Sequence, residues 1–148
     1  MSTPTVTLVP VTADSWRAVA RVRATDEQLE WVAEVTYYLC VCAYGDTWHP
    51  WTIEADGQVA GFLMWAVDDD ASRWIGGFVV DAAHQHRGIG RAAAAEAVRI
   101  LSAQPGCTGI ALSVDPTNEV ARALYRSLGF EETGETEDDE LVMRRRPG

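Results

Sequence analysis

The sequence is short of paired cysteines, basic residues and long hydrophobic runs. Among its 148 residues are three cysteines, Cys40, Cys42 and Cys107, whose number and spacing match neither a disulfide framework nor a zinc site. The three histidines show no metal-ligand spacing with these cysteines. We therefore expect reduced thiols and no metal site, in a chain whose length fits one domain covering residues 1–148.

Basic residues are too few for a nucleic-acid-binding surface. The 12 Lys and Arg face 22 Asp and Glu, which leaves a formal charge of −10, whereas phosphate recognition needs a basic surface. No apolar run approaches the roughly 18–20 residues of a membrane span. The start, Met1–Thr5, lacks the basic and apolar segments of a signal peptide. We expect a cytoplasmic protein without a nucleic-acid or membrane partner, and the acidic excess allows a cationic small substrate without requiring one.

The spacing of apolar residues predicts an α+β fold with a mixed sheet. Asp14 is the expected cap of the first helix, and Trp16, Val19 and Val22 are its expected buried face. An antiparallel meander, with a hairpin turn at Asp56-Gly57, precedes a βαβ half. The expected strands cover residues 5–10, 51–55, 58–67, 73–80, 109–114, 130–135 and 140–145, and the expected helices cover residues 15–22, 26–43, 90–103 and 119–128.

Two glycines, Gly88 and Gly90, open the helix that follows the meander. Free N–H groups at a helix N-terminus carry partial positive charge, and glycine lets a ligand approach the main chain, so the segment suits a pyrophosphate. The residues Gly88–Ala93 also match the dinucleotide pattern G-x-G-x-x-A, but seven residues, Asp81–Arg87, separate the first glycine from the strand. A phosphate-binding P-loop is excluded because no Gly-Lys-Ser/Thr follows. A plain glycine-rich helix start is the remaining alternative.

Two motifs give the chain its resemblance to a known family. Gln85-x-x-Gly88-x-Gly90 resembles the acetyl-CoA pyrophosphate motif of the GNAT N-acetyltransferase superfamily, and Asn118-x-x-Ala121-x-x-Leu124-Tyr125-x-x-x-Gly129-Phe130 resembles its second signature. The resemblance covers nearly the whole chain and implies a single-domain GNAT acyltransferase fold. More loosely, the segments around Tyr37-Tyr38-Leu39 and Gly57–Met64 resemble small polyamine (spermidine/spermine) acetyltransferases.

The resemblance implies acetyl-CoA as cosubstrate and assigns residues to it. The main chain of Phe78, Val79 and Val80 would pair with the pantetheine arm, and Asn118 would bind near that arm. Tyr125 would lie beside the thioester sulfur and protonate the leaving thiolate. The pyrophosphate site would comprise Gln85, His86, Arg87, Gly88, Ile89, Gly90 and Arg91. Two alternatives remain open: Tyr125 as a core aromatic, and Asn118 as a helix cap.

The chain departs from its relatives in the strand before the motif. Many GNAT enzymes carry an acid there, whereas this strand has Gly76-Gly77. The glycine pair predicts a bulge or a close backbone approach, with a merely weakened strand as the alternative. The general base is therefore open among Glu30, Glu34, His49, Asp81 and a water relay.

The acceptor side is expected to form from the early helices and hairpins. Aromatic residues mixed with carboxylates suit a cationic amine, although core aromatics and solvated acids would give the same composition. The substrate-binding candidates are Glu30, Glu34, Tyr38 and His49. The acids of residues 131–140 flank a hairpin turn and are expected to be solvated.

We therefore expect transfer of an acetyl group to a primary amine of a small cationic substrate, with a polyamine as one candidate. Direct attack in a ternary complex needs no covalent enzyme intermediate. The alternatives are acetylation of a protein amine or an antibiotic, and a non-catalytic acyl-CoA-binding sensor module. A homodimer through an exposed strand edge is a further expectation.

Overall fold

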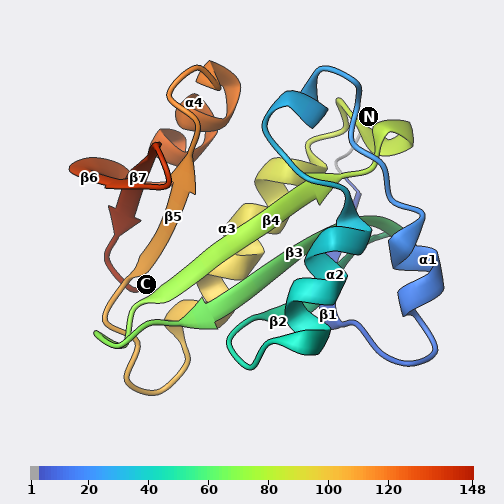
Figure 1. Ribbon diagram of the computed structural model, residues 1–148, viewed down its shortest axis with the longest axis horizontal. Coiled ribbons are helices and arrows are strands. Elements are labelled where there is room, and N and C mark those ends of the chain that lie inside the picture. Colours follow the sequence, from blue (N-terminus) through green and yellow to red (C-terminus); the bar gives the residue numbers. More distant parts are fainter. Residues whose placement is uncertain (1–3) are drawn as a thin grey trace.

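The strands of the computed structural model, which describes residues 4–148, form one seven-stranded sheet in the order β1-β2-β3-β4-β5-β7-β6 (Figure 1). Part of the segment tested for a signal peptide, residues 1–3, lies outside this range. Neighbouring strands run antiparallel except for β4 and β5, which are parallel. The predicted α+β fold, an antiparallel meander joined to a βαβ half, is confirmed. The strands are β1 (Val6–Pro10), β2 (His49–Ala55), β3 (Gln58–Val67), β4 (Arg73–Val80), β5 (Ile110–Val114), β6 (Glu131–Glu137) and β7 (Glu140–Arg145).

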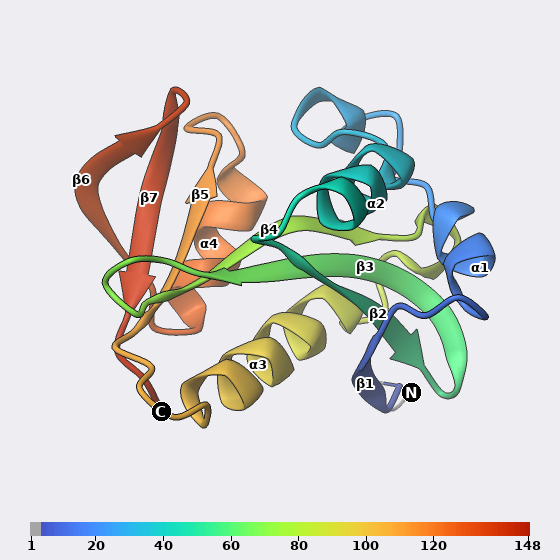
Figure 2. The ribbon, with the colours of Figure 1, turned by 60° about the horizontal axis from the view of Figure 1, so that its bottom comes forward.

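Helices cover both faces of the sheet (Figure 2). On one face, here the α3 face, α3 and α4 pack over a core that includes Leu63, Ile75, Leu112 and Met143. On the other, the α2 face, α1 and α2 cover a smaller core around Phe62. No helix within residues 4–148 is long and apolar enough to cross a membrane. The helices are α1 (Trp16–Ala20), η1 (Gln28–Glu30), α2 (Val35–Tyr44), η2 (Ala82–His84), α3 (Ile89–Ser102) and α4 (Glu119–Ser127).

The helix predicted over residues 26–43 is wrong, because the chain forms two helices, η1 and α2, there. The backbone of Glu34 is extended, with φ −68° and ψ 147°. The N–H of Ala33 donates to the Tyr38 hydroxyl oxygen at 2.9 Å instead of to a helix carbonyl. The apolar spacing of three and four continued across this break, so the periodicity alone could not locate it.

The start of α1 also differs from the prediction. The hydroxyl of Thr12, not the carboxylate of Asp14, accepts hydrogen bonds from the N–H groups of Asp14 and Ser15, both at 3.2 Å. Val19 and Val22 are buried as expected, but Trp16 is 43% exposed. The helix has only five residues, too few to turn all three side chains onto one buried face.

Strands β4 and β5 pair over only three residues and then diverge. Arg73–Ile75 lie beside Ile110–Leu112, and no further pair follows; Figure 1 shows the two strands separating beyond this point. The pairing of β4 with β3 shifts register opposite Phe62–Met64, where Gly77 has a φ of +57°. The predicted bulge at Gly76-Gly77 is confirmed. We call the divergence of β4 and β5 beyond Ile75 and Leu112 the splay.

Candidate active site

The loop between β4 and α3 presents a row of free main-chain donors. Gly88 takes a left-handed conformation, with φ +76°, and is the N-cap of α3. Within residues 4–148, no N–H group from His86 to Arg91 donates a hydrogen bond to the protein. Such unpaired donors at a helix N-terminus attract anions. The loop therefore forms a main-chain site for a phosphate or pyrophosphate.

Side chains hold this loop against its neighbours. The Gln85 amide nitrogen donates to the carbonyl of Val80 at 2.8 Å and to the side-chain oxygen of Gln28 at 3.2 Å. Arg87 lies 3.1 Å from the ring nitrogen Nδ1 of His84, and the exposed Arg91 donates to the Ser127 hydroxyl at the end of α4. Gln85 thus fixes where the loop leaves β4, while two guanidinium groups flank the free N–H groups.

In the part of the chain that the structure describes, the edge of β4 that faces β5 has no strand partner beyond Ile75. Phe78, Val79 and Val80 lie in this segment, with Val79 buried in the core of the α2 face. The side chains of Phe78 and Val80 pack on the α3 face. An unpaired strand edge offers its N–H and C=O groups to any extended ligand that enters the splay.

Asn118 and Tyr125 lie on α4. The side-chain oxygen of Asn118 accepts from the N–H of Ala121 at 3.2 Å, so its interpretation as a helix cap is confirmed. Tyr125 packs edge-on against Phe130, with ring centroids 5.8 Å apart. Burial, with a smaller contribution from the negative charge of Glu140, raises the pKa of Tyr125 to about 12. Its hydroxyl accordingly stays protonated at neutral pH and can act as a proton donor.

On the α2 face, two aromatic rings lie directly over the glycine pair. A Cβ placed on Gly76 would lie 3.1 Å from the Trp48 ring, and one on Gly77 would lie 3.0 Å from Cγ of Tyr38. Burial raises the pKa of Tyr38, the N–H of Ala33 lowers it, and the charge of Glu140 raises it again. The glycines that replace the expected acid thus make room for an aromatic surface at the splay.

The remaining substrate and base candidates are scattered. Glu30 and Glu34 are exposed on either side of the break before α2. His49 is exposed, and its ring lies tilted against that of Trp65 with ring centroids 4.3 Å apart; Trp65 packs on the α3 face. The carboxylate of Asp81 accepts from the N–H of Arg23 at 3.1 Å. Of the four substrate candidates, the structure places Tyr38 over the splay and His49 on the opposite face of the sheet.

Two side-chain contacts near the candidate site were not predicted from the sequence. The indole N–H of Trp31 donates to the hydroxyl of Thr117 at 3.2 Å, which links the segment before α2 to the loop before α4. Residues 131–139 are exposed as expected, but Glu140 is partly buried, and it accepts a hydrogen bond from Ser113 at 2.9 Å. Both contacts join residues far apart in the chain, and no local pattern indicates them.

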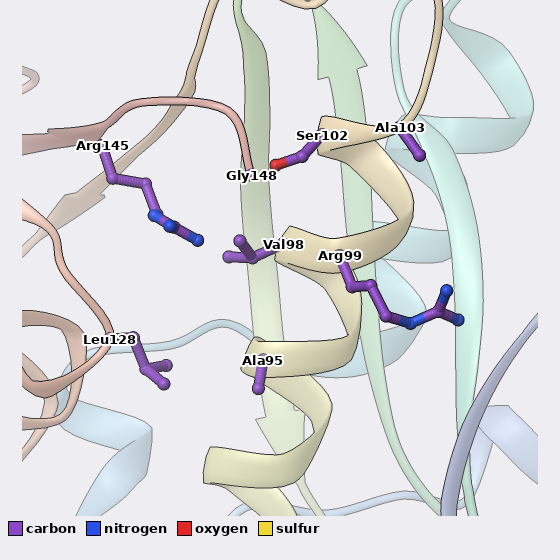
Figure 3. Close-up of a pocket in the computed structure, with 8 residues that line it drawn as sticks. All are labelled: Ala95, Val98, Arg99, Ser102, Ala103, Leu128, Arg145 and Gly148. Carbon is purple, nitrogen blue, oxygen red and sulfur yellow. The ribbon is translucent and has the colours of Figure 1, made fainter.

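A separate hollow of about 380 Å³ lies beside the last turns of α3 (Figure 3). It is lined by Val98, Ser102, Leu128 and Arg145 among others, at the opposite end of α3 from Gly88. No group of three or more His, Cys, Asp or Glu side chains within residues 4–148 could hold a metal ion. The chemistry of the candidate site therefore rests on the loop, the splay and the tyrosines.

A family model described as acetyltransferase (GNAT) family matches residues 15–130. A comparison with the curated proteins found no match.

Among solved structures, AAC(6')-Ib in complex with paromomycin and acetyl-CoA is 21% identical, with a TM-score of 0.79 over 96% of this chain and 93% of that chain. Mycobacterium smegmatis RimJ in complex with CoA-disulfide is 25% identical, with a TM-score of 0.75 over 95% of this chain and 81% of that chain. The ribosomal-protein-S18-alanine N-acetyltransferase from Escherichia coli is 22% identical, with a TM-score of 0.70 over 97% of this chain and 95% of that chain.

Proposed function

Because this chain belongs to the acetyltransferase (GNAT) family, we propose that it moves the acetyl group of acetyl-CoA to a primary amine of a small cationic acceptor. Acetyl-CoA-dependent acyl transfer follows from the family; the acceptor and the residue roles are our proposal. The proposal rests on two features that lie along the same strand, β4: a row of free N–H groups after it and the splay beside it. The free N–H groups of residues 86–91 lie in the loop after β4, and β4 leads back to the splay, where Tyr38 lies over Gly77.

The main chain binds most of the cofactor in this proposal. The N–H groups from His86 to Arg91 hold the pyrophosphate, with Arg87 and Arg91 adding charge. The free edge of Phe78–Val80 pairs with the amides of the pantetheine arm as an added strand would. The side-chain oxygen of Asn118 is used by the helix cap, which leaves its NH₂ group for the cofactor arm.

The reaction needs stabilisation of an oxyanion and a proton for the leaving thiolate. A main-chain N–H in the free segment of β4 stabilises the tetrahedral oxyanion. Tyr125 supplies the proton, because its hydroxyl is neutral at the working pH and the free thiol has a pKa near about 8.5. Holding both reactants at the splay provides much of the acceleration through proximity.

The acceptor enters from the α2 face, where Tyr38 and Trp48 lie over the glycine pair. Aromatic faces bind ammonium groups through cation–π attraction. Polyamines and aminoglycosides both carry several such groups, and the solved structures similar to this chain include AAC(6')-Ib in complex with paromomycin. We place the acceptor in this class of small polycationic amines, and a cytoplasmic location belongs to the same proposal.

A protein amine is the second candidate. It is supported by the similarity to the enzyme named for the alanine of ribosomal protein S18. A peptide with a free N-terminus has one ammonium group where a polyamine has several. A panel of acceptors therefore separates the two candidates.

The test is release of free thiol from acetyl-CoA in the presence of spermidine, an aminoglycoside and a peptide with an N-terminal alanine. We expect thiol release above the amine-free rate, with the polycationic amines ahead of the peptide, and an acetylated product by mass spectrometry. Binding of acetyl-CoA without thiol release for any amine would contradict catalysis and favour a sensor module.

A further inference from the structure

Glu140, the first residue of β7, differs from the other acids of its hairpin. Residues 131–139 are exposed, whereas Glu140 is partly buried. Glu132 and Glu135 form ion pairs with arginines. Within residues 4–148, no Lys, Arg or His forms an ion pair with Glu140. In the described part of the chain, the hairpin thus holds one carboxylate that is partly buried and has no ion-pair partner.

Ser113 ties this carboxylate to the splay. Its hydroxyl donates to Oε1 of Glu140 at 2.9 Å. Ser113 follows Leu112, the last residue of β5 to pair with β4. Since Leu112 and Val114 point into the core of the α3 face, strand alternation directs Ser113 to the α2 face. The carboxylate is therefore held where β5 leaves β4, on the face from which we expect the acceptor to enter.

The opposite side of the splay carries the aromatic surface. Trp48 lies over Gly76, the first residue of β4 beyond the last pair with β5, and Tyr38 lies over Gly77. The charge of Glu140 also acts on both tyrosines. Burial raises the pKa of Tyr125, and Glu140 raises it further. Burial raises the pKa of Tyr38, the Ala33 N–H lowers it, and Glu140 raises it by a smaller amount. Tyr125 belongs to the α3 face, so the carboxylate is within electrostatic reach of residues on both faces of the sheet.

Among residues 4–148, no cationic side chain forms an ion pair with this carboxylate. Arg144, on the same face of β7, is taken by Glu135, with 3.0 Å between Nε and Oε1. A partly buried carboxylate at the same splay as an aromatic surface can attract an ammonium ion through charge and cation–π attraction. The ionisable groups placed around Glu140 are Glu137, its partner in β6, Tyr38 on α2 and Tyr125 on α4.

We propose that Glu140, oriented by Ser113, receives the ammonium group of the acceptor and takes one proton from it before attack. This inference rests on the proposed function and names the general base that the sequence left open. The carboxylate becomes a carboxylic acid and the ammonium a neutral amine, whose nitrogen then bonds to the acetyl carbonyl carbon. As the carbon–sulfur bond breaks, the sulfur takes the proton of Tyr125, and the nitrogen returns a proton to the Tyr125 phenolate. Glu140 finally releases its proton to water.

The test compares Glu140→Gln with the matched control Glu137→Gln, which removes the same charge from an exposed position, the last residue of β6 before the turn. With the amine most active in the thiol-release assay, we expect kcat/KM of Glu140→Gln to fall about 100-fold at neutral pH, a typical loss for a general base. We expect the control to stay within about twofold, as for most exposed substitutions. The Kd of acetyl-CoA, measured by calorimetry, should be the same for both variants and the original protein.

The pH profile separates a base from a structural residue. The defect of Glu140→Gln should shrink as pH approaches the amine pKa of about 10.4, because water then supplies the neutral amine. Ser113→Ala should lower kcat/KM less than Glu140→Gln does, and its defect should also shrink as pH approaches the amine pKa. A loss that is constant with pH, or a Glu140→Gln variant that equals its control, would overturn the inference. Absence of turnover by the original protein with every amine would instead overturn the proposed function.

Discussion

The two sides of the splay are built from different parts of the chain. The side proposed for the cofactor uses main-chain groups, the N–H row of residues 86–91 and the free edge of β4. The side proposed for the acceptor uses side chains from four separate elements or loops, Tyr38, Trp48, Ser113 and Glu140. A site made of main-chain groups depends on local backbone geometry. A site made of side chains depends on packing over long range, so the two sides should respond differently to substitution.

The largest expected effect concerns Tyr125, the proposed proton donor. Tyr125→Phe removes the proton donor and keeps the ring that packs on Phe130. We expect kcat to fall about 100-fold or more, while the calorimetric Kd of acetyl-CoA stays unchanged. Turnover equal to that of the original protein would remove the general-acid role and leave Tyr125 as a core aromatic.

The pH dependence sharpens the same assignment. Because the pKa of Tyr125 is raised to about 12, kcat should not fall as pH passes about 10, the ordinary tyrosine value. The unfolded chain loses this proton near pH 10 and the folded one near 12, so the free energy of unfolding contributed by Tyr125 should decrease across that window. A Tyr125→Phe variant should lack this decrease in pH-dependent denaturation.

The next effect tests the main-chain side alone. Gly88→Asp places a side chain and a negative charge on a residue with φ +76° beside the free N–H groups. We expect the Kd of acetyl-CoA to rise about 100-fold, the combined cost of left-handed strain and charge repulsion. Gly106→Asp is the matched control, since Gly106 has φ +81° in open space beyond the far end of α3. Equal cofactor affinity in both variants would contradict the pyrophosphate site.

A smaller effect tests why the acceptor side has glycines. Gly77→Ala should lower the free energy of unfolding by about 2 kcal/mol, because left-handed strain adds to the contact with Tyr38. Gly57→Ala has similar strain, at φ +82°, without a neighbour within 4 Å. Denaturant unfolding should show a larger loss for Gly77→Ala, and equal losses would mean that Tyr38 does not constrain the bulge.

The smallest effect separates two roles of Asn118. Asn118→Ala should destabilise the protein by about 1 kcal/mol through loss of the cap on α4. Asn118→Ser should restore the cap and the stability. If Asn118 also binds the cofactor arm, the serine variant should still bind acetyl-CoA more weakly by calorimetry. Full affinity in Asn118→Ser would leave only the cap.

The features set by local backbone geometry could be predicted from the sequence better than those set by side-chain packing. Gly88 and Gly90 with Gln85, and the α4 signature ending at Phe130, indicated the family, which the match over residues 15–130 shows. Gly76-Gly77 predicted the bulge because glycine inside a strand often marks a bulge, and Gly77 has the positive φ that glycine adopts easily. The strand and hairpin boundaries followed from alternation and turn residues. These features are local, and they were predicted well.

The missed features depend on side-chain hydrogen bonds, some local and some between distant residues, that leave no mark in the apolar periodicity. The break before α2 is stabilised by the hydrogen bond between Ala33 and Tyr38, which no periodicity shows. Glu140 looked like any other acid of an exposed hairpin until the pairing of β7 with β5 brought it to Ser113. The polyamine resemblance rested on the segments around Tyr37-Tyr38-Leu39 and Gly57–Met64 and is left as a proposal for the acceptor.

The most direct measurement is a crystal structure of the protein with CoA and an acceptor amine. We predict the pyrophosphate on the N–H groups of residues 86–91, the sulfur beside the Tyr125 hydroxyl, and the amine nitrogen against the Glu140 carboxylate on the α2 face. A pyrophosphate bound elsewhere, or a sulfur that emerges away from the splay, would contradict the account.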